Sequence, residues 1–188
     1  MSARLTVQET ADFLRTLDGV LILTHVRPDG DTVGCAAALC RALRALGRTA
    51  YLLENPDHKH MQNWVKKLLH IYQKNPALYE LDSSWGGFEW INANDAERSI
   101  FSFIRKSKDG KNNLLFVCNF TPVERSDYRV GVPKHKTYKL ILNSDDAEFG
   151  GSGKERPVNY KSVSKECDGR PYSFAYPLPG FGVAVFRY

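Results

Sequence analysis

The feature that most constrains this chain is a series of short β-type runs between residues 88 and 186. Each run is rich in β-branched and aromatic residues, and turn signals such as Asp109-Gly110, Pro133 and Pro179-Gly180 separate the runs. About seven or eight short strands at this spacing are typical of an antiparallel β-sandwich. The expected strands are residues 88–91, 99–104, 114–120, 128–132, 137–142, 172–176 and 181–186.

An amphipathic helix is predicted just before the sandwich, over residues 58–74. Its apolar residues recur at helical spacing and form a stripe along one face. Asn75-Pro76 ends the helix, because the residue before a proline disfavours helical geometry. The stripe needs a surface to cover it, and it consists of Met61, Trp64, Val65, Leu68, Leu69 and Tyr72.

The first 56 residues indicate a different architecture, an α/β unit in which helices and strands alternate. Asp31 is the expected N-cap of the second helix, and Gly47 is expected to end that helix. Two strands are too few to make a sheet that buries both of its faces. We therefore expect an incomplete α/β fragment, with helices at 6–17 and 32–46 and strands at 20–23 and 49–53.

Composition also changes near residue 56. Residues 1–56 carry six basic residues, all of them Arg, against six acids, whereas residues 57–188 carry 13 Lys and 7 Arg against 15 acids. The segment charges are therefore 0 and +5. The sequence predicts an α+β composite of a partial α/β fragment (1–56), a helix with a linker (57–81) and an all-β domain (82–188). A chimera of two unrelated fragments would explain the change.

Composition disfavours several functional classes. The net charge of +5 is spread along the chain without a basic run, so no nucleic-acid partner is expected. No apolar stretch approaches the length of about 18 residues that a bilayer requires, and the N-terminus lacks the apolar core of a secretory signal. The four cysteines form no C-x-x-C pair and are interpreted as reduced thiols. We expect a cytoplasmic protein without a membrane partner.

The main candidate for a metal site is the motif H-x-x-x-D-x-D, formed by His25, Asp29 and Asp31 between a strand and a helix. An imidazole and two carboxylates at a tight turn suit a hard divalent cation such as Mn²⁺ or Mg²⁺. The same residues also suit a structural turn, since Asp-Gly-Asp is common in turns and Asp31 is an ordinary N-cap. Spacing alone favours the structural interpretation.

The run LILTHVRPDGDTVG (21–34), with the Ala-rich stretch after it, resembles the start of a DHH-family phosphoesterase over about residues 5–56. The resemblance implies that His25, Asp29 and Asp31 ligate Mn²⁺. The family's later motifs, including its namesake Asp-His-His, have no counterpart in residues 57–188. Because three ligands cannot complete a two-metal site, we expect at most weak Mn²⁺ binding. A Mn-dependent phosphoesterase or oligoribonuclease fragment is one alternative function.

Two features of the second half could carry chemistry. Trp85, Phe88 and Trp90 could form a platform on which sugar rings stack, although core packing is the favoured interpretation. The Gly-rich run 149–153 could cradle a phosphate, but no Walker-type Lys-Ser/Thr follows it. A flexible surface turn is therefore the favoured interpretation of that run.

The second half resembles the C-terminus of a bacterial 1,4-α-glucan branching enzyme over residues 58–188. The resemblance implies the last helix of a catalytic barrel, followed by the all-β C-terminal domain of the α-amylase superfamily. Enzymes of this family cut an α-1,4 glucan chain and rejoin it in an α-1,6 linkage. The motifs recur in order and are HMQNWVKKL (60–68), NPALYE (75–80), GFEWI (87–91), VCNFTPV (117–123), YRVGVP (128–133) and FGGSG (149–153).

The family's chemistry requires an Asp nucleophile and a Glu acid/base about 5–5.5 Å apart. In the family these residues lie in the barrel, upstream of everything matched here, and Glu80, Asp82 and Glu89 occupy non-catalytic positions. We therefore expect a non-catalytic β-domain segment with no catalytic residue and no required cofactor. An α-glucan is the candidate partner, and a stand-alone glucan-binding module is the second alternative. The apolar stripe of the helix also predicts self-association.

Overall fold

The computed structural model describes residues 5–24, 29–52 and 56–188, and the chain divides into two compact units. The first unit comprises residues 1–62 and the second comprises residues 63–188. The division lies within helix α3 (Pro56–Lys74), whose C-terminal part belongs to the second unit. The domain boundaries expected from the sequence, after residues 56 and 81, stay predictions.

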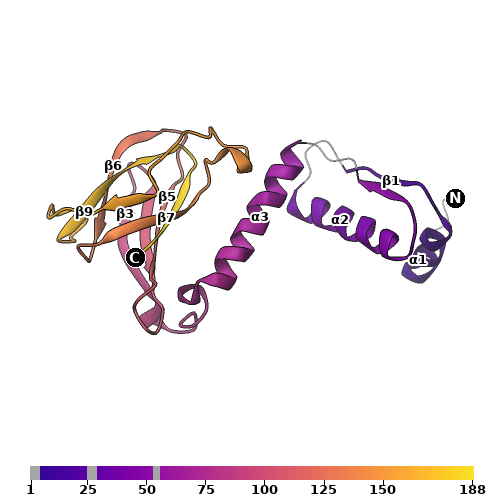
Figure 1. The fold of residues 1–188 in the computed structure, drawn as a ribbon, viewed down its shortest axis with the longest axis horizontal. Coiled ribbons are helices and arrows are strands. Elements are labelled where there is room, and N and C mark those ends of the chain that lie inside the picture. Colours follow the sequence, from indigo (N-terminus) through magenta and orange to yellow (C-terminus); the bar gives the residue numbers. More distant parts are fainter. Residues whose placement is uncertain (1–4, 25–28, 53–55) are drawn as a thin grey trace. The chain divides into compact units, whose positions relative to one another are not determined.

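The described part of the first unit is a small α/β assembly (Figure 1). Its two short strands pair in parallel, and a helix connects them. Cys40, Leu43 and Ala50 form the buried core between this helix and the strands. The order of helix, strand, helix and strand agrees with the sequence prediction. The elements are α1 (Val7–Thr16), β1 (Val20–Ile22), α2 (Gly30–Ala45) and β2 (Ala50–Leu52).

Side-chain caps fix where α1 and α2 begin. Thr6 and Glu9 form a capping box at the start of α1, in which each side chain accepts the backbone N–H of the other residue. Asp29 caps α2, because its Oδ1 accepts the backbone N–H of Thr32 at 2.9 Å. The prediction that Asp31 is this N-cap is therefore wrong by two residues. Asp31 lies in the first turn, where a carboxylate interacts favourably with the helix dipole.

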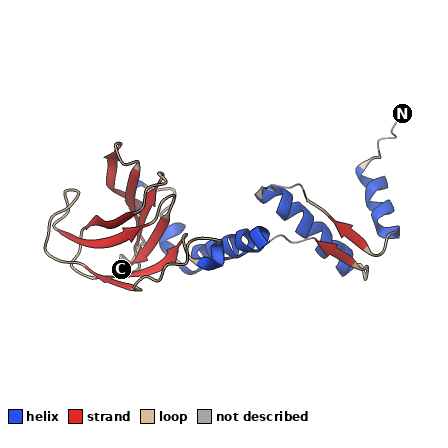
Figure 2. Cartoon of the chain, turned by 90° about the horizontal axis from the view of Figure 1, so that it is seen from above, coloured by secondary structure: helices blue, strands red, loops and turns tan. Residues whose placement is uncertain are grey.

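The second unit contains two antiparallel sheets (Figure 2). Six strands form one sheet in the order β3-β4-β5-β10-β7-β8, and β6 pairs with β9 in the other. The antiparallel β architecture predicted from the sequence is thus confirmed, although the three-residue strand β8 was not predicted because it is too short to show alternation. The strands are β3 (Phe88–Asp95), β4 (Ile100–Arg105), β5 (Leu114–Asn119), β6 (Arg125–Val132), β7 (Thr137–Asn143), β8 (Asn159–Lys161), β9 (Tyr172–Leu178) and β10 (Val183–Arg187).

Aromatic rings fill the space between the two sheets. Tyr138 and Phe186 come from the six-stranded sheet, whereas Phe174 and Tyr176 come from β9, and all four are buried. The ring of Phe186 meets those of Phe174 and Tyr176 at centroid distances of 5.1 Å and at steep angles. Edge-to-face contacts of this kind suit the charge distribution of aromatic rings. This cluster holds the two sheets together.

The outer face of the six-stranded sheet is covered in part by the C-terminal half of α3 and by the 3₁₀ turn η1 (Pro76–Leu78). The ring of Trp64 on α3 also packs here and meets the ring of Phe149 edge-on, with 5.1 Å between centroids. The helix ends where the side chain of Asn75 donates to the carbonyl of Ile71 at 2.7 Å. The buried members of this second cluster are Ile71, Ala77, Leu114, Leu142 and Val185.

All four cysteines are free, and Cys40 and Cys118 are buried. Burial raises the pKa of the Cys118 thiol to about 11, so this thiol stays protonated and unreactive at neutral pH. None of the helices within residues 5–24, 29–52 and 56–188 combines the length and apolarity needed to cross a membrane.

Ile71 gives a direct test of the packing of α3 on the sheet. We expect Ile71→Ala to lower the free energy of unfolding by about 3 kcal/mol, because it leaves a cavity in a buried cluster. Leu69→Ala on the same helix removes an exposed side chain, and its expected effect is within about 0.5 kcal/mol. Urea unfolding of the chain measures both changes, and equal effects of the two variants would contradict the packing.

Candidate functional site

An exposed apolar stripe runs along α3 beside the side that packs on the sheet. It consists of Val65, Leu68, Leu69 and Tyr72, whose side chains are between 39% and 58% exposed. Their spacing of i, i+3, i+4 and i+7 places them on one side of the helix. We call these four residues the α3 stripe. The predicted apolar face is therefore divided, since Trp64 packs on the sheet and the α3 stripe does not.

A hollow of about 300 Å³ lies beside the 3₁₀ turn η2 (Trp85–Gly87). The indole of Trp85 lines this hollow and is 92% exposed. The prediction of core packing is therefore wrong for Trp85. It holds in part for Phe88, which is half-buried and whose ring contacts those of Trp90 and Phe103. The structure thus leaves one large aromatic side chain in water, next to a hollow that Asp82 and Arg105 also line.

The two acids nearest to these aromatic residues are held in ion pairs. Glu89 pairs with Lys106 and, at 2.7 Å, with Arg170, while Asp82 pairs with Arg105 at 2.6 Å. Burial alone would raise the pKa of the Glu89 carboxyl, but Lys106 and Arg170 outweigh burial and hold this pKa below its usual value. A catalytic general acid needs a raised pKa. Glu89 is therefore a structural carboxylate.

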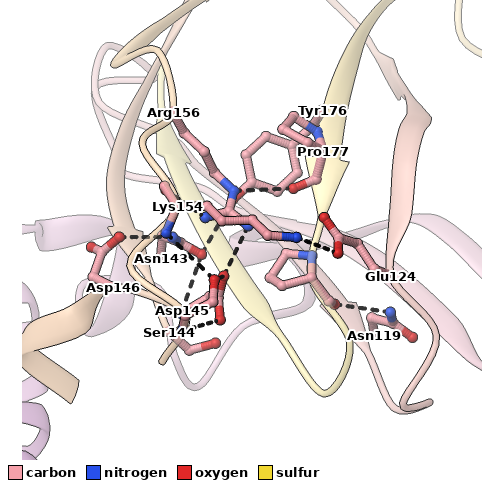
Figure 3. A network of polar contacts seen from close by, with 12 residues as sticks. Asn119, Glu124, Asn143, Ser144, Asp145, Asp146, Lys154, Arg156, Tyr176 and Pro177 are labelled. Atoms are coloured by element: carbon pink, nitrogen blue, oxygen red, sulfur yellow. Dashed lines mark hydrogen bonds and ion pairs between the residues drawn. The ribbon is translucent and has the colours of Figure 1, made fainter. Parts of the chain in front are cut away.

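The Gly-rich run 149–153 folds against the partly buried carboxylate of Asp145 (Figure 3). Ser152 donates its backbone N–H to Oδ1 of Asp145 at 2.8 Å, and the Ser152 hydroxyl donates to Oδ2. Gly151 approaches so closely that a Cβ added there would lie 2.3 Å from the backbone carbonyl carbon of Asp145. The run is a surface turn, as the favoured sequence interpretation holds, and it carries defined hydrogen bonds to a side chain that the sequence did not indicate.

Arg156 ties this turn to the second sheet (Figure 3). Its side chain is 4% exposed, and its Nη2 lies 2.9 Å from Oδ2 of Asp145. Its Nε donates to the carbonyl of Pro177 on β9 at 3.2 Å, and Nη1 donates to the carbonyl of Lys154 at 2.9 Å. Burial alone would raise the pKa of the Asp145 carboxyl, but hydrogen bonds from Ser152 and Arg156 outweigh burial and lower this pKa. The Arg156–Asp145 pair therefore connects the loop after β7, in the six-stranded sheet, to β9 in the other sheet.

The structure places two of the three predicted metal ligands. Asp29 and Asp31 are both exposed at the start of α2. Oδ1 of Asp29 accepts the hydroxyl of Thr32 at 2.6 Å in addition to the capping N–H. His25 lies outside the described residues. Among the side chains of the described ranges, no group of three His, Cys, Asp or Glu is arranged to hold a metal ion.

Comparison with known proteins identifies the β unit. A sequence model of the family described as "Alpha amylase, C-terminal all-beta domain" matches residues 90–188. The chain belongs to this family. The match runs from within β3 to the last residue, so this alpha-amylase C-terminal domain includes both sheets and the aromatic cluster between them.

Curated relatives of the domain carry the name 1,4-alpha-glucan branching enzyme GlgB. The protein of Butyrivibrio fibrisolvens is 52% identical over 136 residues, which are 72% of this chain and 21% of that protein. Those of Halothermothrix orenii and Aquifex aeolicus are 42% and 43% identical over 136 and 138 residues, or 72% and 73% of this chain and 22% of each relative. The chain spans about a fifth of the length of the relatives it matches.

The resemblance to the C-terminal β domain of a branching enzyme is thus confirmed, whereas these matches do not show a phosphoesterase fragment in residues 5–56. Sequence reasoning missed the pair of Arg156 and Asp145, because two residues in one irregular loop give no periodic signal. It also missed the exposure of Trp85. A signal was present there, since the run DSSWGG (82–87) surrounds the indole with residues that favour turns.

The Arg156–Asp145 pair of the alpha-amylase C-terminal domain gives a prediction about stability and pH. We expect Asp145→Asn to lower the free energy of unfolding at pH 7 by about 2 kcal/mol, because it leaves a buried guanidinium without its anion. Since the pKa of Asp145 is lowered by folding, its contribution is present above the unfolded pKa of about 3.9 and is lost as the pH falls through the folded pKa. Urea unfolding between pH 7 and pH 2.5 measures the difference between variant and parent.

The matched control for this experiment is Asp127→Asn, which removes the charge of an exposed aspartate on β6 and should change stability by less than about 0.5 kcal/mol. A loss of stability in Asp145→Asn that stays constant down to pH 2.5 would contradict the assignment of the effect to the ionised carboxylate.

Proposed function

We propose that residues 63–188 act as the non-catalytic C-terminal β domain of a 1,4-α-glucan branching enzyme and pack on the part of such an enzyme that this chain does not contain. The α3 stripe is the observation that carries the proposal. It leaves four large apolar side chains exposed on a helix whose other side is fixed to the sheet. Relatives of this domain are about five times as long as the matched segment, so they contain further surface that could cover the stripe.

A non-catalytic role is supported by the state of the carboxylates in the β unit. Glu89 and Asp145 each face cations that lower their pKa, which is the opposite of what a glycosidic general acid requires. Both carboxylates also hold structural elements together through these ion pairs. Activity on glucan would therefore come from the remainder of a branching enzyme. The four free cysteines support a cytoplasmic location.

The α3 stripe suits a protein surface better than water for a physical reason. An apolar face this wide on a helix is normally buried. Full burial of a large apolar side chain contributes about 1.5–3 kcal/mol, and the half-exposed residues of the stripe forfeit about half of that each. Because Trp64 and Ile71 fix the helix to the sheet, the stripe is held in place and does not need to be ordered on binding. These properties support a preformed docking face for the catalytic part of a branching enzyme.

A hybrid enzyme tests this role. The matching segment of the Butyrivibrio fibrisolvens branching enzyme is replaced by residues 63–188, and branching is followed by iodine colour and by α-1,6 linkages formed on amylose. We expect the hybrid to branch, while the 188-residue chain alone forms no more linkages than a boiled control. Leu69→Asp in the hybrid should lower its melting temperature by about 5 °C or more, because it places a charge in the docking face.

Lys66→Asp is the matched control, since it adds the same carboxylate at an exposed position of α3 outside the stripe. Equal melting temperatures of the Leu69→Asp and Lys66→Asp hybrids would contradict the docking role. Dimers of the chain that dissociate on Leu69→Asp would instead show that a second copy covers the stripe.

We also propose that the first unit is a DHH-type fragment that binds Mn²⁺ weakly through His25, Asp29 and Asp31. The support is the β-α-β arrangement of β1, α2 and β2, with both carboxylates exposed where α2 begins. Carboxylate and imidazole donors suit this ion. Three protein ligands leave about half of the six coordination positions of Mn²⁺ to water, so a bound ion would be exchanged easily.

Calorimetry of the chain with MnCl₂ tests this second proposal. We expect a dissociation constant of about 1 mM or weaker, and no detectable binding in Asp31→Asn. Asp29→Asn should also abolish binding, yet it keeps α2 intact because asparagine caps helices as well as aspartate does. Asp12→Asn on α1 is the control and should bind like the parent chain. A micromolar site that survives Asp29→Asn and Asp31→Asn would contradict the ligand assignment.

A further inference from the structure

We propose that the turn between β6 and β7 binds a nucleoside polyphosphate, with the base stacked on His135 and the phosphates held by the lysines around it. Four exposed lysines belong to this site, and we call them the lysine group. They are Lys134, Lys136, Lys161 and Lys165. The proposal is independent of the docking role, because none of these residues is part of the α3 stripe.

A pair of stacked rings lies at the centre of the site. The imidazole of His135 stacks on the ring of Tyr172, with 5.3 Å between centroids and 12° between planes. Tyr172 is half-buried on β9 and packs against the core between the two sheets, whereas His135 is exposed. One face of the imidazole is therefore covered by Tyr172, and the other face is open to a further flat ring. Nucleic-acid bases stack on aromatic side chains in this way.

A buried serine fixes the backbone on both sides of the imidazole. The Oγ of Ser162 accepts the backbone N–H of Lys136 at 3.0 Å and lies 3.3 Å from the carbonyl oxygen of Lys134. The backbone N–H of Ser162 donates to the carbonyl of Lys136 at 3.0 Å. The hydroxyl of Tyr138 also donates to the carbonyl of Lys134, at 2.9 Å. The turn is therefore preformed, and a ligand would not have to order it.

Two members of the lysine group flank the imidazole in the turn, and hydrogen bonds bring the other two from a second segment. Lys161 directly precedes Ser162, which bonds the turn. The carbonyl of Lys165 accepts the hydroxyl of Ser173 at 2.6 Å, and Ser173 follows the stacked tyrosine in the sequence. All four lysines therefore start from backbone next to the ring pair.

The lysine group has no negative counterpart in the part of the chain that the structure describes. No ion pair joins any of its four ammonium groups to a carboxylate among residues 5–24, 29–52 and 56–188. Glu166 is the one acid in the segments 133–137 and 161–166, so four lysines against one acid give these segments a formal charge of +3. Like charges that gather in a folded chain repel one another and lower its stability. A bound anion would remove this repulsion.

A nucleoside polyphosphate combines the two features that the site can recognise. Its base offers a flat face to the imidazole, and its phosphates concentrate several negative charges that suit more than one lysine. An acidic peptide or an inorganic anion supplies the charge without the base. A longer single strand of nucleic acid would stack on several rings, and the segments 133–137 and 161–166 contain no ring besides His135.

Calorimetry of the 188-residue chain with ATP, in a low-salt buffer that contains EDTA, tests the site. EDTA removes divalent cations, so a metal bound by the first unit does not contribute. We expect a dissociation constant of about 0.5 mM for ATP. Pyrophosphate should bind about fivefold or more weakly, because it lacks the base. Raising NaCl from about 20 mM to about 200 mM should weaken ATP binding about tenfold, since salt screens exposed charges.

Variants of the chain separate stacking from charge. His135→Ala should weaken ATP binding about fivefold or more, while its affinity for pyrophosphate stays within about twofold of the parent. His135→Phe should restore ATP affinity to within about twofold, because it keeps an aromatic face. Lys161→Gln should weaken the binding of both ligands about threefold, because it removes one cation from the lysine group.

Lys108→Gln is the matched control, because it removes one exposed lysine from the loop between β4 and β5, which takes no part in the site. It should bind ATP like the parent chain. The proposal is overturned if the parent binds no ATP up to about 5 mM, if His135→Ala binds ATP as the parent does, or if pyrophosphate binds as tightly as ATP. A decathymidylate strand that binds more than about tenfold more tightly than ATP would identify single-stranded nucleic acid as the ligand and would also overturn it.

Discussion

The contact on which the rest of the β unit depends is the packing of α3 and η1 on the outer face of the six-stranded sheet. Ile71 and Ala77 are buried against Leu114 and Val185, which lie on adjacent central strands. Arg105 on β4 also donates a hydrogen bond to the carbonyl oxygen of Leu78, the last residue of η1, and so connects η1 to the sheet. The position of the α3 stripe follows from this packing, because the same helix carries both sets of side chains.

The packing also explains why one helix has two apolar sides with different roles. The side with Trp64 and Ile71 completes the outer face of the sheet, as a core would. The α3 stripe extends beyond what the sheet covers, although it costs solubility to expose it. The proposed function assigns the exposed side of this helix to a second body, and the family assignment identifies the first body as the alpha-amylase C-terminal domain.

The sequence predicted the elements well where a regular pattern marks them. In β4, buried and half-buried residues alternate, and in α3 apolar residues recur at helical spacing. Each of these patterns predicted the correct type of element. The cap at Asp29 was misplaced by two residues, because Asp29 and Asp31 are chemically equivalent candidates and the backbone decides between them. The ion pair between Asp145 and Arg156 could not be predicted. It depends on an irregular loop whose Arg156 also bonds the carbonyl of Pro177 on β9, far away in the sequence. The exposure of Trp85 depends on how η2 turns, which composition indicates but does not determine.

The measurement that tests the account most directly is native-state hydrogen exchange of the 188-residue chain. If residues 63–188 form one unit, the amides of α3 from Trp64 to Lys74 exchange through the same opening as those of β5 and β10, with the same free energy and the same dependence on denaturant. The amides of α2 should open separately and at lower cost, because their core is small. Exchange of the C-terminal half of α3 together with α2, and before β5, would contradict the account.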